Sequence, residues 1–209
     1  MINNNPVSEI ELYKEEVISI MKELKFIKRN TKSKYNSLIN SMCILQLYSS
    51  WEGFIFNTLE TIKNYIRNEV IDRDVLNKQL YVLSINDYLK RISGSPNFEK
   101  KVNVMREIKE LQSNVINFPL TNTKANVSSK VLNQLFYVVG INNIVNSIGD
   151  DMRTMDKYLI IRGKLAHGKE AITIRDAQVT EYSNTIVEVI DSVILKVYEY
   201  IDDDSYMKS

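Results

Sequence analysis

The chain has 209 residues, of which 44% are hydrophobic and 25% charged, and its formal net charge is +1. This size and composition are typical of one soluble globular domain. Three prolines and six glycines are few for this length, which favours helices over a β-sandwich or β-barrel. The near-zero net charge excludes a strong overall attraction to nucleic acid or to an acidic membrane. Any contact with RNA must therefore come from a local patch or from dimerisation.

The sequence holds one cysteine, Cys43, and one histidine, His167. These two residues cannot make a zinc site, so we expect no metal and no other cofactor. Cys43 lies in an apolar run, residues 42–45, which predicts a buried, reduced thiol. No segment has the length and apolar character of a membrane span, and residues 1–5 are not followed by the apolar core of a signal peptide. We therefore expect a cytoplasmic protein without a membrane partner.

Two long helices are predicted in the first third of the chain. Asn5-Pro6 and Ser8-Glu9-Ile10-Glu11 both have the pattern of a helix start, the second as a capping box, and this helix should end near Arg29-Asn30-Thr31. Apolar residues at helical spacing from Leu38 to Ile66 predict a second helix, the longest of the chain. Between Met42 and Phe56 they cover most of the circumference, which places this helix in the core or at a partner interface.

The middle third is less regular than the rest. We expect short helices near Val75–Ile92 and Asn97–Val115, with a break at Gly94-Ser95-Pro96 between them. Asn117–Asn126 shows no period and is predicted to be a loop. We interpret about 71–126 as an insertion or peripheral region of a single domain that spans residues 1–209.

Helical periodicity returns in the last third. Ser128-Ser129 can cap a helix that ends at Gly140, and a short helix is expected at Asn142–Ser147. A further helix should start at Gly149-Asp150-Asp151, with Gly168 at its C′ position. The last helix follows a turn and has apolar residues at helical intervals from Val179 to Ile201. The elements predict an all-α bundle with a long central helix, a helical insertion and a long C-terminal helix.

The sequence Arg162-Gly163-Lys164-Leu165-Ala166-His167-Gly168 carries the only chemically suggestive pair of side chains. Five positions on a helix rotate a side chain by about 140° and advance it by about 7.5 Å, so Arg162 and His167 do not share one stripe. Two chains that meet about a twofold axis would bring both pairs into one cleft more readily than one chain can. The motif therefore predicts a homodimer as well as a site.

An arginine and a histidine suit the cleavage of RNA. Imidazole can take the proton of a ribose 2′-hydroxyl or give one to the leaving 5′-oxygen, and guanidinium can hold the phosphate. The products would be a 2′,3′-cyclic phosphate and a 5′-hydroxyl, and no metal is needed because the substrate supplies the nucleophile. By spacing alone the same residues also fit a helix end, with Arg162 on the surface, His167 near the last carbonyls and Gly168 as the stop.

The surroundings of the motif resemble the HEPN superfamily, all-helical domains in which an arginine is followed after four to six residues by a histidine. The stretch from Arg162 to Gly168 is similar to the Arg-Asn-x-x-Ala-His-Gly form of that motif, and it lies before the last long helix. Trp51-Glu52-Gly53-Phe54 and Asn126–Leu132 also look like this group. The resemblance covers most of the chain and is to the bacterial MAE-type and RiboL-PSP-type proteins, which implies a HEPN-like bundle that is dimeric through its motif helices.

In this superfamily the arginine and histidine are catalytic in metal-independent endoribonucleases, and that role would fall on Arg162 and His167. Many members are toxins or anti-phage effectors, so a cognate antitoxin or a sensor protein is a further implied partner. The sequence departs from the pattern at Gly163, where the family usually has asparagine or another polar residue. The missing side chain bears on activity more than on fold.

Several other residues are supporting candidates with two interpretations each. Glu52 either orients Arg162 or His167 or forms a structural ion pair. Lys164 and Lys169 either contact phosphates or are solvated, and Tyr158 either stacks on a base or packs in the core. Trp51 is expected in the core or at a dimer contact. One basic run is either a face that follows RNA or a solvated helix end: Lys25, Lys28, Arg29, Lys32 and Lys34.

Three functions remain open at this point. The favoured one is a metal-independent endoribonuclease in a toxin or phage-defence setting, with RNA as its substrate. The first alternative is a catalytically inactive HEPN-type protein that binds RNA or nucleotide, or that acts as a dimeric scaffold, which Gly163 and the near-neutral charge favour. The second is a helical interaction protein in which the motif is only a helix cap.

Overall fold

The computed structural model describes residues 5–111, 116–121, 126–167 and 172–208, and helices make up almost all of their regular structure. The expected all-α bundle is confirmed, since only one isolated antiparallel bridge, Leu76 to Met207, pairs extended segments in this part of the chain. The α-helices are α1 Pro6–Arg29, α2 Asn36–Glu69, α3 Lys78–Ser84, α4 Asn86–Ser93, α5 Phe98–Glu110, α6 Ser129–Val138, α7 Ile144–Ile148, α8 Asp151–His167 and α9 Asp176–Asp202. Two 3-10 turns, η1 Ser33–Tyr35 and η2 Arg73–Val75, precede α2 and α3.

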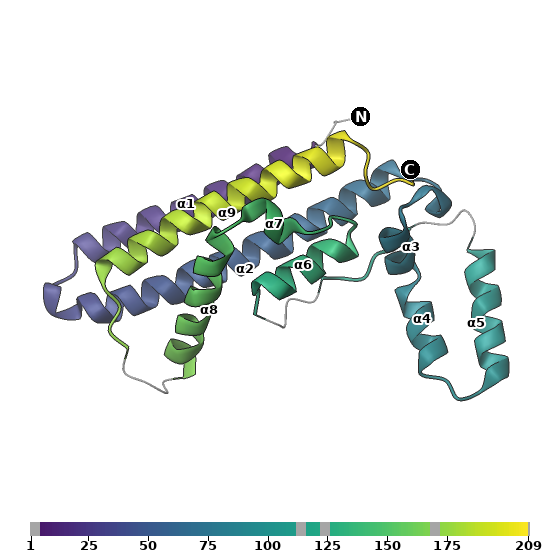
Figure 1. The fold of residues 1–209 in the computed structure, drawn as a ribbon, viewed down its shortest axis with the longest axis horizontal. Helices are drawn as coiled ribbons and strands as arrows, with labels where there is room; N and C mark the ends of the chain where they lie inside the picture. Colours follow the sequence, from purple (N-terminus) through teal and green to yellow (C-terminus); the bar gives the residue numbers. More distant parts are fainter. Residues whose placement is uncertain (1–4, 112–115, 122–125, 168–171, 209) are drawn as a thin grey trace.

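Three long helices, α1, α2 and α9, lie side by side and form the body of the molecule (Figure 1). The first begins at Pro6, whose missing N–H costs nothing at a helix start, and the Asn5 side chain accepts a hydrogen bond from the Val7 N–H at 3.0 Å. The Asn5-Pro6 start is thus confirmed, and the capping box predicted at Ser8 is wrong because Ser8 lies inside α1. The helix ends at Arg29, as expected.

The centre of α2 forms the middle of the core, as its apolar circumference indicated. Tyr48, Trp51 and Phe54 are all buried, and the rings of Trp51 and Phe54 stack with their centres 6.2 Å apart. Cys43 is buried one helical turn earlier than Leu47, and this burial raises the pKa of its thiol. Helices α1, α8 and α9 all pack against α2. The longest helix therefore anchors every element that surrounds the motif.

The middle third differs in detail from the prediction. The helix expected over residues 75–92 is divided into α3 and α4 at Ile85, whose backbone leaves the helical region (φ −109°, ψ 9°) and whose side chain is buried. The break after α4 is confirmed, and α5 begins at Phe98 behind the capping side chain of Asn97. Helices α4 and α5 pack on each other and extend away from the three long helices (Figure 1).

The last third follows the prediction closely. Ser128 caps α6 by accepting from the Val131 N–H, and α8 begins at Asp151 and ends at His167. The short helix α7 lies two residues later than expected at its start. Gly168, the predicted C′ residue of α8, lies outside the described residues.

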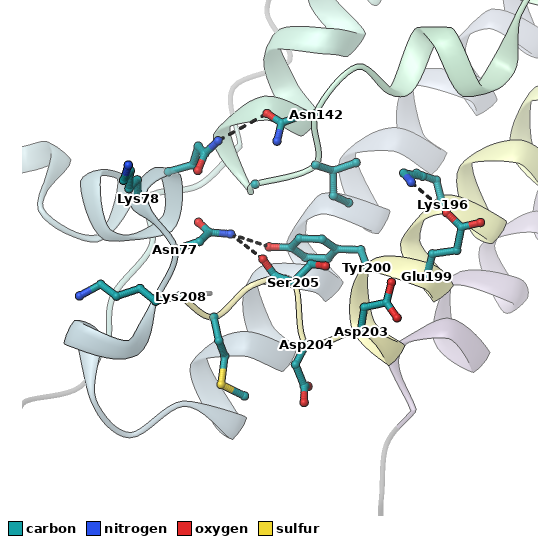
Figure 2. Close-up of a pocket in the computed structure, with 14 residues that line it drawn as sticks. Asn77, Lys78, Asn142, Lys196, Glu199, Tyr200, Asp203, Asp204, Ser205 and Lys208 are labelled. Atoms are coloured by element: carbon teal, nitrogen blue, oxygen red, sulfur yellow. Dashed lines mark hydrogen bonds and ion pairs between the residues drawn. The ribbon is translucent and has the colours of Figure 1, made fainter.

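The chain end folds back on the turn before α3, at the far end of the bundle. The backbone N–H of Asn77 donates to the Tyr206 carbonyl at 2.9 Å. The side-chain amide of Asn77 donates to the Ser205 carbonyl at 3.0 Å, as Figure 2 shows. Gly140 lies against this junction with φ +94°, and a Cβ there would be 2.4 Å from Nδ2 of Asn77. The Tyr200 hydroxyl donates to the Val139 carbonyl at 2.6 Å. These contacts fix the end of α9 against α3 and α6.

We expect Trp51→Ala to lower the free energy of unfolding by about 3–5 kcal/mol, because it empties the most enclosed part of the core. Denaturant unfolding followed by circular dichroism measures this change. Gly53→Ala on the same helix is the matched control, since a Cβ at Gly53 meets nothing within 4 Å. That control should be neutral or stabilise by about 0.5–1 kcal/mol. An unchanged unfolding midpoint for Trp51→Ala would contradict its place in the core.

Candidate functional site

Arg162 and His167 both lie in the last two turns of α8. Because α8 packs on α2 and α9, its inward side faces the core at Tyr158, which is fully buried. Arg162 is partly buried one turn later, and His167 is exposed as the final residue of the helix. Arg162 therefore lies close to the protein interior, whereas the His167 side chain lies in solvent at the end of the helix.

Two contacts hold the Arg162 guanidinium. Its Nη1 donates a hydrogen bond to Oδ1 of Asn126 at 3.0 Å, and its central carbon lies 5.0 Å from the centre of the Tyr48 ring. A guanidinium at this distance is attracted to the negative face of the ring. Nη2 and Nε donate to no residue within the described part of the chain. Arg162 is therefore held in position but keeps donors for a further anion.

Tyr48 also holds the segment that carries Asn126. Its hydroxyl accepts a hydrogen bond from the backbone N–H of Val127 at 2.8 Å, and both residues are buried. Burial and the negative charge of Glu52 raise the pKa of the Tyr48 hydroxyl, although the Val127 N–H and Arg162 act in the opposite direction. The phenol therefore stays neutral at physiological pH. One side chain of α2 thus fixes both Arg162 and its hydrogen-bond acceptor.

Glu52 lies one helical turn after Tyr48 and is partly buried. It forms no ion pair with any residue that the structure describes, so the structural ion pair offered as one interpretation is not found there. Its charge instead contributes to raising the pKa of Tyr48 and, after burial and Tyr48, that of Tyr182. Glu52 is therefore near the site and reaches Arg162 through Tyr48 rather than by direct pairing.

Tyr158 belongs to the core, which corrects the expectation that it contacts substrate. Its exposed fraction is 0%, and its ring stacks on Tyr182 with the ring centres 4.3 Å apart. Its hydroxyl lies 2.6 Å from the Gln178 carbonyl oxygen and 2.8 Å from Oε2 of Glu181. Neither face of this ring is open to a base, because the whole side chain is buried.

The remaining predicted residues surround the motif in different ways. Gly163 is partly buried, but a Cβ there would meet nothing within 4 Å, so packing does not require a glycine. Lys164 is partly buried on the same helix, and Lys169 lies outside the described residues. A side chain at position 163 therefore has room for at least its Cβ atom.

Sequence reasoning missed Tyr48 and the individual role of Asn126. Asn126 belongs to a segment already noted for its resemblance, but its amide gave no sign of a partner 36 residues away. Tyr48 lies four residues before Glu52 on a helix that is apolar nearly all round, where an aromatic residue predicts only core packing. The available signal in the sequence was a tyrosine four residues before a glutamate within this apolar run.

A comparison with known protein families identifies the family of the chain. Residues 8–199 match the family model described as RiboL-PSP-HEPN. The chain belongs to the RiboL-PSP-HEPN family. No curated protein and no solved structure gives a match. The match includes α2, α8 and nearly all of α9, and so covers every residue that contacts Arg162.

A cavity of this HEPN domain with a volume of about 920 Å³ lies elsewhere, between the chain end and α3. The groups at its base are already bonded to one another, as the Asn77, Tyr200 and Ser205 contacts in Figure 2 show. Lys196 pairs with Glu199 at its edge. In the part of the chain that the structure describes, no helix has the length and apolarity needed to cross a bilayer. Because the polar groups of that cavity already bond to one another, the end of α8 that carries Arg162 and His167 remains the candidate site.

We expect Tyr48→Phe to lower the free energy of unfolding by about 1–3 kcal/mol, because the Val127 N–H loses its acceptor in a buried place. Tyr137→Phe is the control: Tyr137 is exposed on α6, so that variant should change stability by less than about 0.5 kcal/mol. Chemical denaturation of both variants measures the difference. Equal stabilities would show that the hydroxyl does not hold the segment.

Proposed function

We propose that this HEPN protein is a metal-independent endoribonuclease that cleaves RNA through the ribose 2′-hydroxyl. The observation that carries the proposal is the position of the Arg162 guanidinium, which Asn126 and Tyr48 hold in place. Arg162 lies five residues before His167 on the same helix, and the imidazole of His167 is exposed. Membership of the RiboL-PSP-HEPN family supports a nuclease-like or RNA-related function. The particular reaction is our inference from the chemistry of the two side chains.

The reaction balances without an outside reagent. The 2′-oxygen forms a bond to phosphorus as the bond from phosphorus to the 5′-oxygen breaks. Imidazole takes the proton of the 2′-hydroxyl, and an imidazolium gives a proton to the leaving 5′-oxygen. The free nitrogens of Arg162 stabilise the charge on the phosphate oxygens in the transition state. The products are a 2′,3′-cyclic phosphate and a 5′-hydroxyl.

A homodimer would supply the two imidazoles that this scheme uses. One chain has a single histidine, whereas acid and base act on opposite sides of the scissile phosphate. Pairing of two motif helices about a twofold axis would place two copies of Arg162 and His167 along one cleft. Ile160, a large apolar residue on α8 with 63% of its surface exposed, supports a contact at this helix.

The biological setting is part of the proposal. A toxin or anti-phage effector of the cytoplasm, controlled by a cognate antitoxin or a sensor protein, is the setting that the superfamily resemblance implies. Glu52 and Lys164 are proposed as supporting residues, and Lys169 as a phosphate contact close to the histidine. The domain is proposed to be single, with about 71–126 as its peripheral region.

A second candidate is a HEPN domain that binds RNA or nucleotide without cleaving it, or that serves as a dimeric scaffold. Gly163 favours it, because a glycine provides no side-chain donor or acceptor beside Arg162. In this case Arg162 would still bind a phosphate, and His167 would have no role in bond cleavage.

We expect the purified protein to cleave labelled RNA in EDTA and to leave cyclic-phosphate ends. His167→Ala and Arg162→Ala should each abolish cleavage while the dimer persists in size-exclusion chromatography. Asn126→Ala should lower kcat by about tenfold or more, since a charge-assisted hydrogen bond of Arg162 is lost. Cleavage that survives in His167→Ala would refute the mechanism. RNA binding without cleavage, weakened by Arg162→Ala, would favour the second candidate.

Gly163→Asn should raise cleavage several-fold, because it restores a polar side chain at a position where a Cβ meets nothing within 4 Å. Gly163→Ala is the matched control: it should stabilise the helix by about 0.5–1 kcal/mol without the increase in rate. Initial rates in EDTA and thermal melting of both variants separate the two effects. Equal rates for the two variants would show that the missing polar group does not limit the reaction.

A further inference from the structure

The turn between α1 and α2 concentrates positive charge that the proposed reaction does not use. From Leu24 to Trp51 the sequence has no aspartate or glutamate, although the whole chain has a net charge of only +1. This basic turn, residues 25–36, contains the following cations: Lys25, Lys28, Arg29, Lys32 and Lys34. A local surplus of this kind attracts phosphate groups even when the protein as a whole is neutral.

The basic turn surrounds a depression with a volume of about 360 Å³. Its lining includes Lys25, Lys28 and Arg29 from the end of α1, together with Ser33 and Asn36. Lysine and arginine side chains provide charged donors, while the hydroxyl and the amide provide neutral ones. This set of donors suits an oxyanion such as a phosphodiester.

One carboxylate also lines the depression, and its charge is already neutralised. Asp176, at the start of α9, pairs with Lys28 at 2.9 Å and accepts a hydrogen bond from the Asn40 amide at 2.8 Å. The hydrogen bond from Lys28 and the one from Asn40 lower the pKa of Asp176. Lys25 and Arg29 are exposed and pair with no acidic side chain among the described residues. Two cations therefore remain available to a ligand.

Two exposed aromatic rings flank these cations. Phe26 follows Lys25 directly and has 69% of its surface exposed, and Tyr35 has 46% exposed. Nζ of Lys34 lies 4.9 Å from the centre of the Tyr35 ring. Aromatic rings beside backbone-binding cations are the combination that binds single-stranded nucleic acid, because unpaired bases stack on the rings.

The basic turn lies at the end of the bundle from which α9 begins (Figure 1). Asn40 donates to the Ile174 carbonyl at 2.8 Å, which joins α2 to the residues just before α9. His167 precedes Asp176 by nine residues, a span of at most about 30 Å even when fully extended. A single RNA strand several nucleotides long can therefore contact both places.

We propose that the basic turn is a phosphate-binding site for single-stranded RNA, in which Lys25 and Arg29 bind the backbone and Phe26 and Tyr35 stack on bases. It deepens the proposed function, because the strand bound there continues to Arg162 and His167. The shared ligand chemistry is a phosphate monoanion or diester, and the donors of the depression match one such group at a time.

The test measures fluorescence anisotropy of a labelled RNA of about 20 nucleotides with 2′-O-methyl riboses, which the proposed reaction cannot cleave. We expect Lys25→Glu/Arg29→Glu to raise Kd by about tenfold or more and to lower the salt slope of log Kd by about 1.4, for two lost phosphate contacts. Phe26→Ala should raise Kd by about fivefold or more through lost stacking. Arg106→Glu/Lys109→Glu on α5 is the matched control, because both residues are exposed and the charge change is identical.

Two further measurements distinguish RNA from other phosphate-containing ligands, namely a free anion and a membrane surface. Inorganic phosphate should compete only weakly with the RNA; full displacement at low concentration would overturn the assignment to RNA in favour of a free anion. Binding to phosphatidylserine vesicles that is lost in Lys25→Glu/Arg29→Glu, with RNA binding unchanged, would overturn it in favour of a membrane surface. Equal RNA affinity of the wild type and this variant, or an equal loss in the α5 control, would also overturn it.

Cleavage of a labelled trinucleotide, which has only two phosphodiesters and so makes few contacts away from the cleaved bond, separates this proposal from the catalytic one. Trinucleotide cleavage that depends on His167 and is unchanged in Lys25→Glu/Arg29→Glu, with weaker binding of the long RNA, supports both proposals. Weaker binding of the long RNA without any trinucleotide cleavage supports the basic turn and contradicts the catalytic proposal. Circular dichroism melting of each variant confirms that its fold is intact.

Discussion

The contacts of the Tyr48 side chain hold the candidate site together. Tyr48 is buried in α2, its hydroxyl accepts from the Val127 N–H, and its ring faces the Arg162 guanidinium. Asn126, next to Val127, then accepts from Arg162. A buried polar group whose hydrogen bonds are satisfied adopts few other conformations. Each lost hydrogen bond would leave a donor or acceptor buried without a partner, which costs free energy. Contacts with Tyr48 and Asn126 therefore restrict the conformation of the otherwise flexible Arg162 side chain.

The same arrangement explains how a motif with Gly163 can still present an organised arginine. In the superfamily a polar residue usually follows the arginine on the same helix, whereas here an amide reaches Arg162 from another segment of the chain. Asn126 takes one guanidinium nitrogen and leaves others for an anion. The open space at Gly163 shows that the glycine is not enforced by neighbouring atoms. The orientation of Arg162 therefore does not depend on a polar side chain at position 163.

Charge in this protein is distributed locally, which reconciles a net charge of +1 with a proposed RNA ligand. The basic turn has no acidic residue of its own, and the one carboxylate that approaches it, Asp176, is paired with Lys28. Elsewhere, Arg91 on α4 and Glu107 on α5 form an exposed ion pair. The basic turn therefore offers a phosphate group local positive charge at the end of the bundle from which α9 begins.

The sequence by itself determined the helices, their approximate ends and the two side chains of the motif, because periodicity and caps are encoded within a few neighbouring residues. Local sequence predicted the helix start at Pro6, the break after α4 and the Ser128 cap. The break at Ile85, in contrast, depends on packing. Only the tertiary structure decided that Tyr158 is enclosed by α9 and that Tyr48 and Asn126 hold Arg162. Those contacts join segments far apart in the chain, and which distant side chains meet depends on how the helices pack.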